Sequence, residues 1–256
     1  MATYKKRGSK SKSSGTKLEQ LENKSATAGV FNTLDEGASK TEQWVANNQR
    51  NIFLILGVIA VTIIGYLAYD KYVQQPNEIK AMNEMYTAQT YFESANNTKN
   101  DSLFNLSLKG ADGKLGMLDI IDNYSGTKAS NLANYYAGMA YYNIKDYRNS
   151  IKHLNEFKSE DEILSAISVG SIGDSYSELN LFTDAFEYYS KAFEVSNNDF
   201  TTPMYLLKAG YVGLEIDKAN DSYEFFMKIK SEFPNSIEAT NIDALIGMAS
   251  SRSSSN

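Results

Sequence analysis

Residues 134–141 read NYYAGMAY, and after a short break residues 146–157 read DYRNSIKHLNEF. A small residue followed by a second amphipathic run is typical of two α-helices that pack closely. Similar patterns recur at GDSY 173–176 with DAFEYYSKA 184–192, and at KAGYVG 208–213 with SYEFFMKI 222–229. Gly138, Gly173 and Gly210 are 35 and 37 residues apart. A recurrence at this period predicts stacked helix pairs.

These segments resemble the tetratricopeptide repeat, a helix–turn–helix unit of about 34 residues with small side chains where its helices cross. Pro234 matches the terminal proline of that unit, whereas Gly213 stands where Tyr141 and Tyr176 match a large residue. No unit carries the early tryptophan, so the repeats are degenerate. The resemblance implies an all-α fold, a tetratricopeptide-like helical solenoid, in which the repeat-packing residues are Gly138, Ser150, Gly173, Ala185, Gly210 and Ser222.

The repeat domain is expected to span residues 76–249. A divergent unit precedes the three, with a helix over about 78–95, a loop at 96–101 and a second helix that includes 116–124. Thr202 before Pro203 predicts a helix N-cap, and Pro234 with Ser236 predicts a helix end followed by a new cap. Residues 237–248 are expected to form a final capping helix. The Ser-rich residues 250–256 are expected to be disordered.

Outside the repeats, residues 52–69 read IFLILGVIAVTIIGYLAY, without a charge between Arg50 and Asp70. A helix of this length spans about 27 Å, close to the hydrocarbon core of a bilayer. A buried core helix is the first alternative, but such helices are more often about 10–14 residues long. A cleaved signal peptide is the second, but the stretch begins late and ends in a poor cleavage site. The sequence therefore predicts one retained transmembrane helix within residues 39–75.

Basic residues set the expected orientation of this helix. Residues 1–51 hold nine basic and five acidic side chains, a net of +4, and residues 70–256 hold sixteen and twenty-six, a net of −10. Because positively charged flanks stay in the cytoplasm, the N-terminus is expected there and the C-terminal domain is expected to be exported. The charges predict a single-pass membrane protein with an exported C-terminal domain. The many asparagines and the absence of cysteine favour a bacterial chain, in which the span is expected in the inner membrane and the domain in the periplasm.

The segment before the span, residues 1–38, is rich in Ser, Gly, Lys and Thr and is expected to be a disordered basic tail. Ser39 and Glu42 fit a capping box, so a helix is expected to begin there. The basic cluster from Lys5 to Lys12 has three interpretations, namely contact with anionic lipid, contact with a ribosome, or a topology signal alone.

Chemistry-bearing patterns are scarce. The chain has no cysteine, which excludes disulfides and thiolate chemistry. Its one histidine, His153, has no neighbouring ligand arrangement, so a packing or surface role is expected. No nucleophile–base pair, metal cluster or phosphate loop is apparent. We therefore expect a protein that is not an enzyme and takes no cofactor.

A solenoid of helix pairs has a concave groove lined by its first helices. Aromatic and methionine side chains there suit contact with other proteins, although several are equally explained as packing between helices. The residues expected to line this partner groove are Leu132, Tyr135, Met139, Tyr142, Asp174, Met204, Leu207, Tyr211 and Leu214.

A basic tail, one membrane helix and degenerate repeats together resemble the YfgM-like family of ancillary subunits of the bacterial Sec translocon. The resemblance rests on this plan of the chain and on no active-site motif. It implies protein partners: Sec translocon subunits, a membrane-anchored periplasmic prolyl isomerase, and exported chains that are passed to chaperones. The alternative hypothesis is an anchored scaffold for envelope assembly or cell division.

Overall fold

The computed structural model describes residues 26–195 and 197–254, and this part of the chain is all-helical, as predicted. Among these residues there is no strand; Ala111 and Lys114 form an isolated bridge in a turn. The elements in chain order are α2 (Ala26–Tyr69), the π-helical η1 (Asp70–Gln74), α3 (Gln75–Thr98), α4 (Asp101–Lys109), α5 (Met117–Asn123), α6 (Lys128–Asn143), α7 (Tyr147–Glu156), α8 (Glu162–Glu178), α9 (Phe182–Val195), α10 (Thr201–Glu215), α11 (Ala219–Glu232), the 3-10 turn η2 (Ile237–Ala239) and α12 (Ile242–Ser253).

The contacts group the chain into two compact units, residues 1–69 and 70–256. Helix α2 is the described part of the first unit and contains the apolar stretch. Large side chains along it are exposed, for example Val61 at 71% and Tyr66 at 68%. Thr62 Oγ1 donates to Val58 O at 2.8 Å, so this hydroxyl is satisfied within its own helix. Among the described residues, one helical stretch within Thr41–Thr98 is long and apolar enough to cross a membrane.

Helix α2 begins earlier than the sequence predicts. Its first residue is Ala26, so Ser39 lies inside the helix and does not cap its start. Residues 26–38 contain no proline and include the good helix formers Ala28, Leu34 and Glu36, which favours continuing the helix toward the N-terminus. Part of the tail that was predicted to be disordered is therefore helical. Residues 1–25, with the basic cluster, lie outside the described residues.

The second unit opens with three helices in place of the predicted two. Helix α3 covers the predicted 78–95 and runs on to Thr98, ending at Lys99, whose φ is 53°. Helix α4 occupies a segment with no predicted helix, and the Asn100 Oδ1 atom caps it by accepting from Ser102 N at 2.9 Å. Helix α5 lies within the predicted 116–124. The two ends of the link between α4 and α5 approach each other closely, since a Cβ on Gly116 would lie 2.3 Å from Gly110 N.

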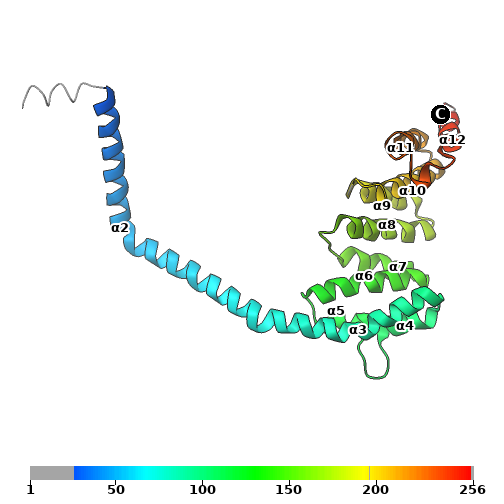
Figure 1. Cartoon of the computed structure of the whole chain (residues 1–256), viewed down its shortest axis with the longest axis horizontal. Helices are drawn as coiled ribbons and strands as arrows, with labels where there is room; N and C mark the ends of the chain where they lie inside the picture. The colour runs from blue at the N-terminus through cyan, green and yellow to red at the C-terminus, as the bar shows by residue number, and fades with distance from the viewer. Residues whose placement is uncertain (1–25, 196, 255–256) are drawn as a thin grey trace, which may run out of the picture. The chain divides into compact units, whose positions relative to one another are not determined.

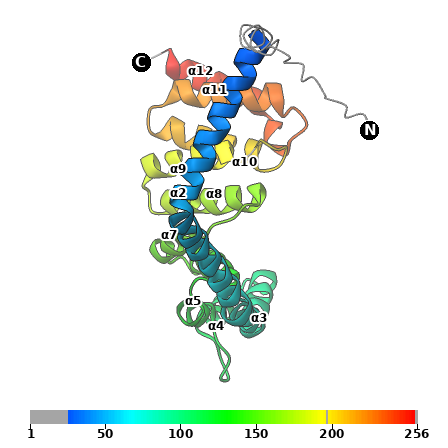
Figure 2. The same cartoon turned by 90° about the vertical axis from the view of Figure 1, so that its left-hand side faces the viewer.

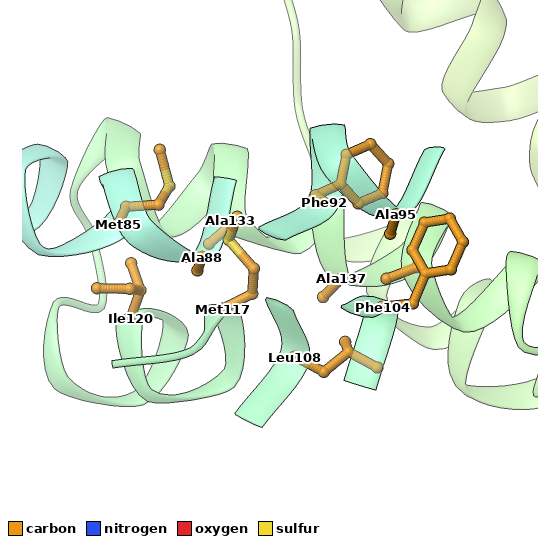
Figure 3. Close-up of a cluster of buried hydrophobic side chains, with 11 residues drawn as sticks. Met85, Ala88, Phe92, Ala95, Phe104, Leu108, Met117, Ile120, Ala133 and Ala137 are labelled. Atoms are coloured by element: carbon orange, nitrogen blue, oxygen red, sulfur yellow. The ribbon is translucent and has the colours of Figure 1, made fainter. Parts of the chain in front are cut away.

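One hydrophobic cluster joins these helices to α6. Met85 and Phe92 from α3, Phe104 from α4 and Ile120 from α5 belong to this cluster, with Met85 and Ile120 at one end of it, Phe92 and Phe104 at the other, and alanines of α6 between them (Figure 3). The rings of Phe92 and Phe104 meet edge to face with centroids 5.6 Å apart. The Glu78 carboxylate of α3 accepts from the backbone N–H of Lys128 (2.7 Å) and of Ala129 at the start of α6. A carboxylate at a helix N-terminus is favourable, so this contact fixes α3 against α6.

Three helix pairs follow: α6 with α7, α8 with α9, and α10 with α11 (Figure 1). The glycine of each first helix receives a large side chain from the second helix. A Cβ on Gly138 would lie 2.5 Å from Leu154 Cγ, and one on Gly173 would lie 2.7 Å from the Tyr189 ring. A Cβ on Gly210 would lie 2.3 Å from the Phe226 ring. The small second-helix residues are buried as well: Ser150, Ala185 and Ser222 are each 0% exposed.

The same kind of turn joins the first helix to the second helix in each pair. Its left-handed residue is Lys145, Asn180 or Asp217, with φ of 64°, 58° and 58°. The next N–H bonds to a carbonyl five positions back, from Asp146 to Tyr141, from Leu181 to Tyr176 and from Lys218 to Gly213, at 2.8–2.9 Å. This is the Schellman arrangement, which satisfies carbonyls at the end of a helix. The two helices of each pair are therefore joined by a turn with the same hydrogen bond and the same left-handed residue.

The start of α10 differs from the prediction. Thr202 lies inside the helix, and the cap is the Asn198 side chain, whose Oδ1 accepts from Phe200 N (2.9 Å) and Thr201 N (2.7 Å). Thr202 Oγ1 instead accepts from Asn198 N at 3.0 Å. Two side chains thus exchange bonds with the backbone, an arrangement that a threonine–proline pair alone does not indicate.

The predicted final helix over 237–248 is divided by Asn241, whose φ is 63°. Ser236 caps η2 as expected, since its Oγ accepts from Ala239 N at 3.2 Å. Helix α12 then continues to Ser253, into the segment that was predicted to be disordered from residue 250. The Arg252 guanidinium donates to Leu214 O at 2.8 Å and Ser253 bonds Asn220, so tertiary contacts hold this end. Within the second unit, α11 and α12 lie at one end and α3 to α5 at the other (Figure 2).

Candidate functional site

The first helices of the pairs lie next to one another, since α6 contacts α8 and α8 contacts α10. These helices carry all nine residues that were predicted to line a partner groove. Four of the nine are half-buried packing residues: Leu132 and Met139 lie against the cluster around α3 to α6, Met204 against the cluster of α8 to α10, and Leu207 against that of α10 to α12.

Leu214 does not lie on an open face. It is 5% exposed and belongs to the core between α10, α11 and α12. Residues of α11 and α12 pack around it in that core, and the Arg252 guanidinium of α12 donates to the Leu214 carbonyl. The sequence placed Leu214 by helical spacing from Tyr211, but the spacing does not reveal which helix covers that turn.

Three predicted tyrosines keep a solvent-facing part. Tyr211 is 49% exposed and meets Phe226 edge to face, with centroids 6.1 Å apart. Tyr135 is half-buried between Tyr136 and Phe157, with ring centroids at 5.8 and 5.2 Å. Tyr142 packs on Tyr147 at 5.6 Å. Each ring is fixed by an aromatic neighbour while its remaining surface is available, which suits contact at low entropic cost.

Asp174 of α8 is the polar centre of this face. Its carboxylate accepts from Lys208 Nζ at 2.6 and 2.9 Å and from the Tyr189 hydroxyl at 2.7 Å. The Lys208 ammonium also lies 5.6 Å from the ring centroid of Tyr189 and 5.5 Å from that of Tyr205, within the range of cation–π attraction. One carboxylate therefore links α8, α9 and α10.

The acidic centre affects the surrounding phenols. Burial, and next the Asp174 charge, raises the pKa of Tyr142 to about 12. The same two causes raise the pKa of Tyr189 and of Tyr205 above the ordinary tyrosine value. All three phenols therefore remain protonated and neutral near pH 7. The face offers hydroxyl groups and ring surfaces, and its central charge is already compensated by Lys208.

The sequence predicted Asp174, Tyr135 and Tyr142 for this face but did not predict Lys208, Tyr205 or Tyr189. Lys208 follows the predicted Leu207 directly, yet it lies 34 positions from the carboxylate that it bonds. The sequence does contain one signal for this face. Asp174 and Tyr211 each follow a repeat glycine by one position, so they occupy equivalent positions on α8 and α10.

A separate cleft of about 480 Å³ lies between the α5–α6 link and α7. His153 is 8% exposed there, and its Nδ1 lies 2.9 Å from Asn134 Oδ1. Asn134 Nδ2 donates to Ser130 O at 3.3 Å, which leaves Oδ1 as the acceptor and places the imidazole proton on Nδ1. Tyr141 stacks on the ring at 5.5 Å. His153 is thus a packed, hydrogen-bonded residue, as expected.

Lowering the pH below about 6.5 is expected to reduce the stability of this region through His153. Burial, and next Lys152, lowers the His153 pKa in the folded state, while Asp122 and Glu156 oppose the shift. The unfolded chain then binds more protons, so this stability is complete above the unfolded pKa and is lost as the pH falls through the folded pKa. Urea midpoints at pH 7.5 and 5 are expected to differ less for His153→Gln than for the parent. Equal differences would contradict the assignment.

Within residues 26–195 and 197–254, no group of three or more acidic or histidine side chains is placed to hold a metal ion. Comparison with protein-family models, with curated proteins and with solved structures gives no match. The interpretation of function therefore rests on the residues and the geometry of this chain.

Proposed function

We propose that this chain is a membrane-anchored protein-interaction subunit whose second unit is a tetratricopeptide-like solenoid. The observation that carries the proposal is the exposed, uncharged helical segment 52–69 on a chain that continues into a helical repeat-like unit. An apolar helix of that length is stable when lipid covers it. The proposed role is non-catalytic, and the face around Asp174, Tyr142 and Tyr211 is where a protein partner binds.

The proposed location is a bacterial inner membrane, with residues 1–51 in the cytoplasm and the repeat unit in the periplasm. The net charges of +4 and −10 on the two sides of the span support this orientation. The chain contains no cysteine, so Lys12→Cys and Glu215→Cys provide unique labels. With a membrane-impermeant maleimide on intact spheroplasts, we expect labelling at position 215 alone. Labelling at position 12 alone would reverse the orientation.

We further propose that the partners are Sec translocon subunits, a periplasmic prolyl isomerase and exported chains. The support is the plan of the chain, which the YfgM-like family shares. Anchoring holds the face close to the membrane and raises its effective concentration near a translocon, so weak contacts are sufficient. The second candidate function is a scaffold for envelope assembly or cell division, which the same anchored repeat plan also favours. The basic tail adds an optional contact with anionic lipid or a ribosome.

Purification of the tagged full chain in mild detergent, followed by mass spectrometry, is the deciding experiment. Recovery of translocon subunits, an isomerase and several exported chains would support the export role. A single stoichiometric partner involved in assembly or division, without the translocon, would favour the scaffold.

The double variant Tyr135→Ala/Tyr211→Ala is expected to lower partner recovery about tenfold, because aromatic anchors carry a large share of interface energy. Tyr86→Ala is the matched control, since Tyr86 is 70% exposed on α3 and lies outside the face. Melting curves by circular dichroism check that each variant folds. If recovery is unchanged in a folded double variant, the partner binds elsewhere.

A further inference from the structure

The cleft of about 480 Å³ beside His153 has an open hydrogen-bond acceptor in its wall. The imidazole is 8% exposed and its Nδ1–H donates to Asn134 Oδ1, so the lone pair lies on Nε2. No group within residues 26–195 and 197–254 donates to Nε2. The buried side-chain atoms of those residues that lack a partner are the hydroxyls of Ser107 and Ser190, so Nε2 is not enclosed and opens onto the cleft that the ring lines.

Three charged side chains stand at the rim of the same cleft. Asp122 lies near the end of α5, and Lys152 and Glu156 lie on α7, before and after His153; all three are exposed. The side chains of these three residues form no ion pair and no hydrogen bond with any other described residue. Lys152 and Glu156 are four positions apart, a spacing that allows pairing on a helix, and they do not pair. The rim therefore offers two carboxylates and one ammonium that are open to a ligand.

These groups fit a ligand that is a zwitterion with N–H donors. Nε2 requires a donor, and the carboxylates favour a donor that carries a positive charge. Lys152 favours an anion attached to that donor. A metal ion does not fit, because no three acidic or histidine side chains of the described ranges are placed to hold one. The matching ligand is thus a primary ammonium joined by a short link to an anionic group, and the cleft has the size of a small-ligand pocket.

The imidazole is in the protonation state that this ligand needs. Burial, and next Lys152, lowers the pKa of His153, while Asp122 and Glu156 oppose the shift. The ring is therefore neutral at pH 7.5, and Nε2 accepts a hydrogen bond from a cation without a repulsive charge on the ring.

The wall of the cleft is bonded to a residue that closely follows the apolar stretch 52–69. Gln74 Nε2 donates to the carbonyl of Gly126 at 3.0 Å, and Gly126 lines the cleft. Gln74 is the fifth residue after Tyr69, and five helical residues rise about 7.5 Å. The polar region on each side of a bilayer is about 5–8 Å deep. When residues 52–69 lie in the hydrocarbon core, Gln74 is therefore one headgroup layer away along the chain.

We propose that this cleft binds the phosphoethanolamine headgroup of a membrane lipid. The ammonium donates to His153 Nε2 and to the carboxylates of Asp122 and Glu156, and the phosphate meets Lys152. The inference goes beyond the proposed protein-interaction role, from which it differs in ligand and in residues. The headgroup chemistry stands on the cleft alone, whereas a lipid as its source rests on the proposed membrane anchor. Soluble phosphoethanolamine compounds carry the same chemistry, and the experiment separates the two sources.

His153 is the only histidine of the chain, so histidine labelled with ¹⁵N gives one imidazole to follow by nuclear magnetic resonance. Glycerophosphoethanolamine, a headgroup without acyl chains, is titrated at pH 7.5 into the full chain in dodecyl maltoside. A saturable shift of the Nε2 resonance is expected. Glycerophosphocholine is expected to cause none, because its quaternary ammonium carries the same charge but has no N–H.

Three outcomes of this titration would overturn the proposal. Absence of a saturable shift would mean that the cleft is closed or is filled by another part of the chain or by a second copy. Equal shifts with glycerophosphocholine would mean that Nε2 accepts no bond from the ligand. Equal affinity for glycine would mean that the phosphate is not recognised.

Two double variants test the carboxylates. Asp122→Asn/Glu156→Gln is expected to weaken binding at least about tenfold, because the charge-assisted bonds to the ammonium are lost. Glu215→Gln/Glu224→Gln is the matched control, since it removes two exposed carboxylates outside the cleft, and it is expected to bind like the parent. Circular dichroism checks that both variants fold. Equal weakening in the two variants would indicate general attraction of cations and would overturn the proposal.

Nanodiscs identify the source of the headgroup. The full chain is placed in discs of phosphatidylethanolamine or of phosphatidylcholine, each with the same fraction of phosphatidylglycerol. The His153 signal is expected at its ligand-bound position in the first discs and at its free position in the second. A free position in both would overturn a lipid as the ligand. A chain that fails to enter either disc would instead contradict the proposed anchor, while glycerophosphoethanolamine would still bind the cleft.

Discussion

Phe226→Ala is expected to lower the free energy of unfolding of the repeat unit by about 3–5 kcal/mol. The Phe226 side chain is 0% exposed, fills the notch of Gly210 and belongs to the core of α10 to α12. Truncation removes a large apolar surface and leaves a cavity in the core between α10, α11 and α12. Urea unfolding of the full chain, followed by far-UV circular dichroism, measures the change.

Tyr223→Ala is the control for this substitution. Tyr223 lies on the same helix but is 37% exposed, so its loss is expected to cost well under half as much. If the two variants unfold at the same urea concentration, Phe226 does not hold α10 and α11 together. In that case the contact between Gly210 and the Phe226 ring would not stabilise the helix pair.

Gly210→Ala and Gly247→Ala are expected to change stability in opposite directions. A methyl group on Gly210 would overlap the Phe226 ring, and such overpacking lowers the free energy of unfolding by about 1–3 kcal/mol. A methyl group on Gly247 meets nothing within 4 Å, and alanine is favoured over glycine inside a helix. Gly247→Ala is therefore expected to raise the free energy of unfolding by about 0.5–1 kcal/mol.

The comparison uses one substitution at two positions of the same repeat register. Thermal and urea midpoints of the two variants are measured beside the parent chain under identical detergent conditions. A destabilised Gly247→Ala would mean that another group already packs against Gly247, either from the same chain or from a second copy. A stable Gly210→Ala would mean that the Phe226 ring moves aside freely, which would contradict close packing at the crossing.

Much of the helical plan follows from sequence spacing. The spacing of the repeat glycines predicted the positions of α6 to α11. Each glycine and the large side chain that packs against it lie close together in the chain, so they form a local sequence pattern. Helix α4 was missed because its nine residues carry no repeat glycine, and its cap, Asn100, stood in a segment predicted to be a loop. The end of α12 was missed because Arg252 is held by a carbonyl of α10, a contact that composition does not indicate.

The candidate face was predicted in part, for a similar reason. Helical spacing identifies which side of a helix faces which way, so Tyr135, Tyr142, Asp174 and Tyr211 were predicted for one face, and the three tyrosines keep a solvent-facing part. It does not identify partners across three helices, and the bonds of Asp174 to Lys208 and Tyr189 depend on how successive pairs stack. Leu214 shows the converse error, since a covering helix can bury a residue whose spacing places it on an open side.

Each repeat glycine is followed at a constant interval by the large side chain that packs against it, from 138 to 154, from 173 to 189 and from 210 to 226, and this constancy has an evolutionary consequence. The distance from one glycine to the next is 35 residues in the first case and 37 in the second, while the interval inside a pair never changes. The difference therefore falls between the large side chain of one pair and the glycine of the next. The links 157–161 and 196–200 each hold five residues, so the difference lies in the helix ends, because α9 extends six residues beyond Tyr189 whereas α7 extends two beyond Leu154. A helix end of this kind can change in length without disturbing the register inside any pair. Each pair can in this way be inherited as a module, while the ends of its helices absorb the drift in length.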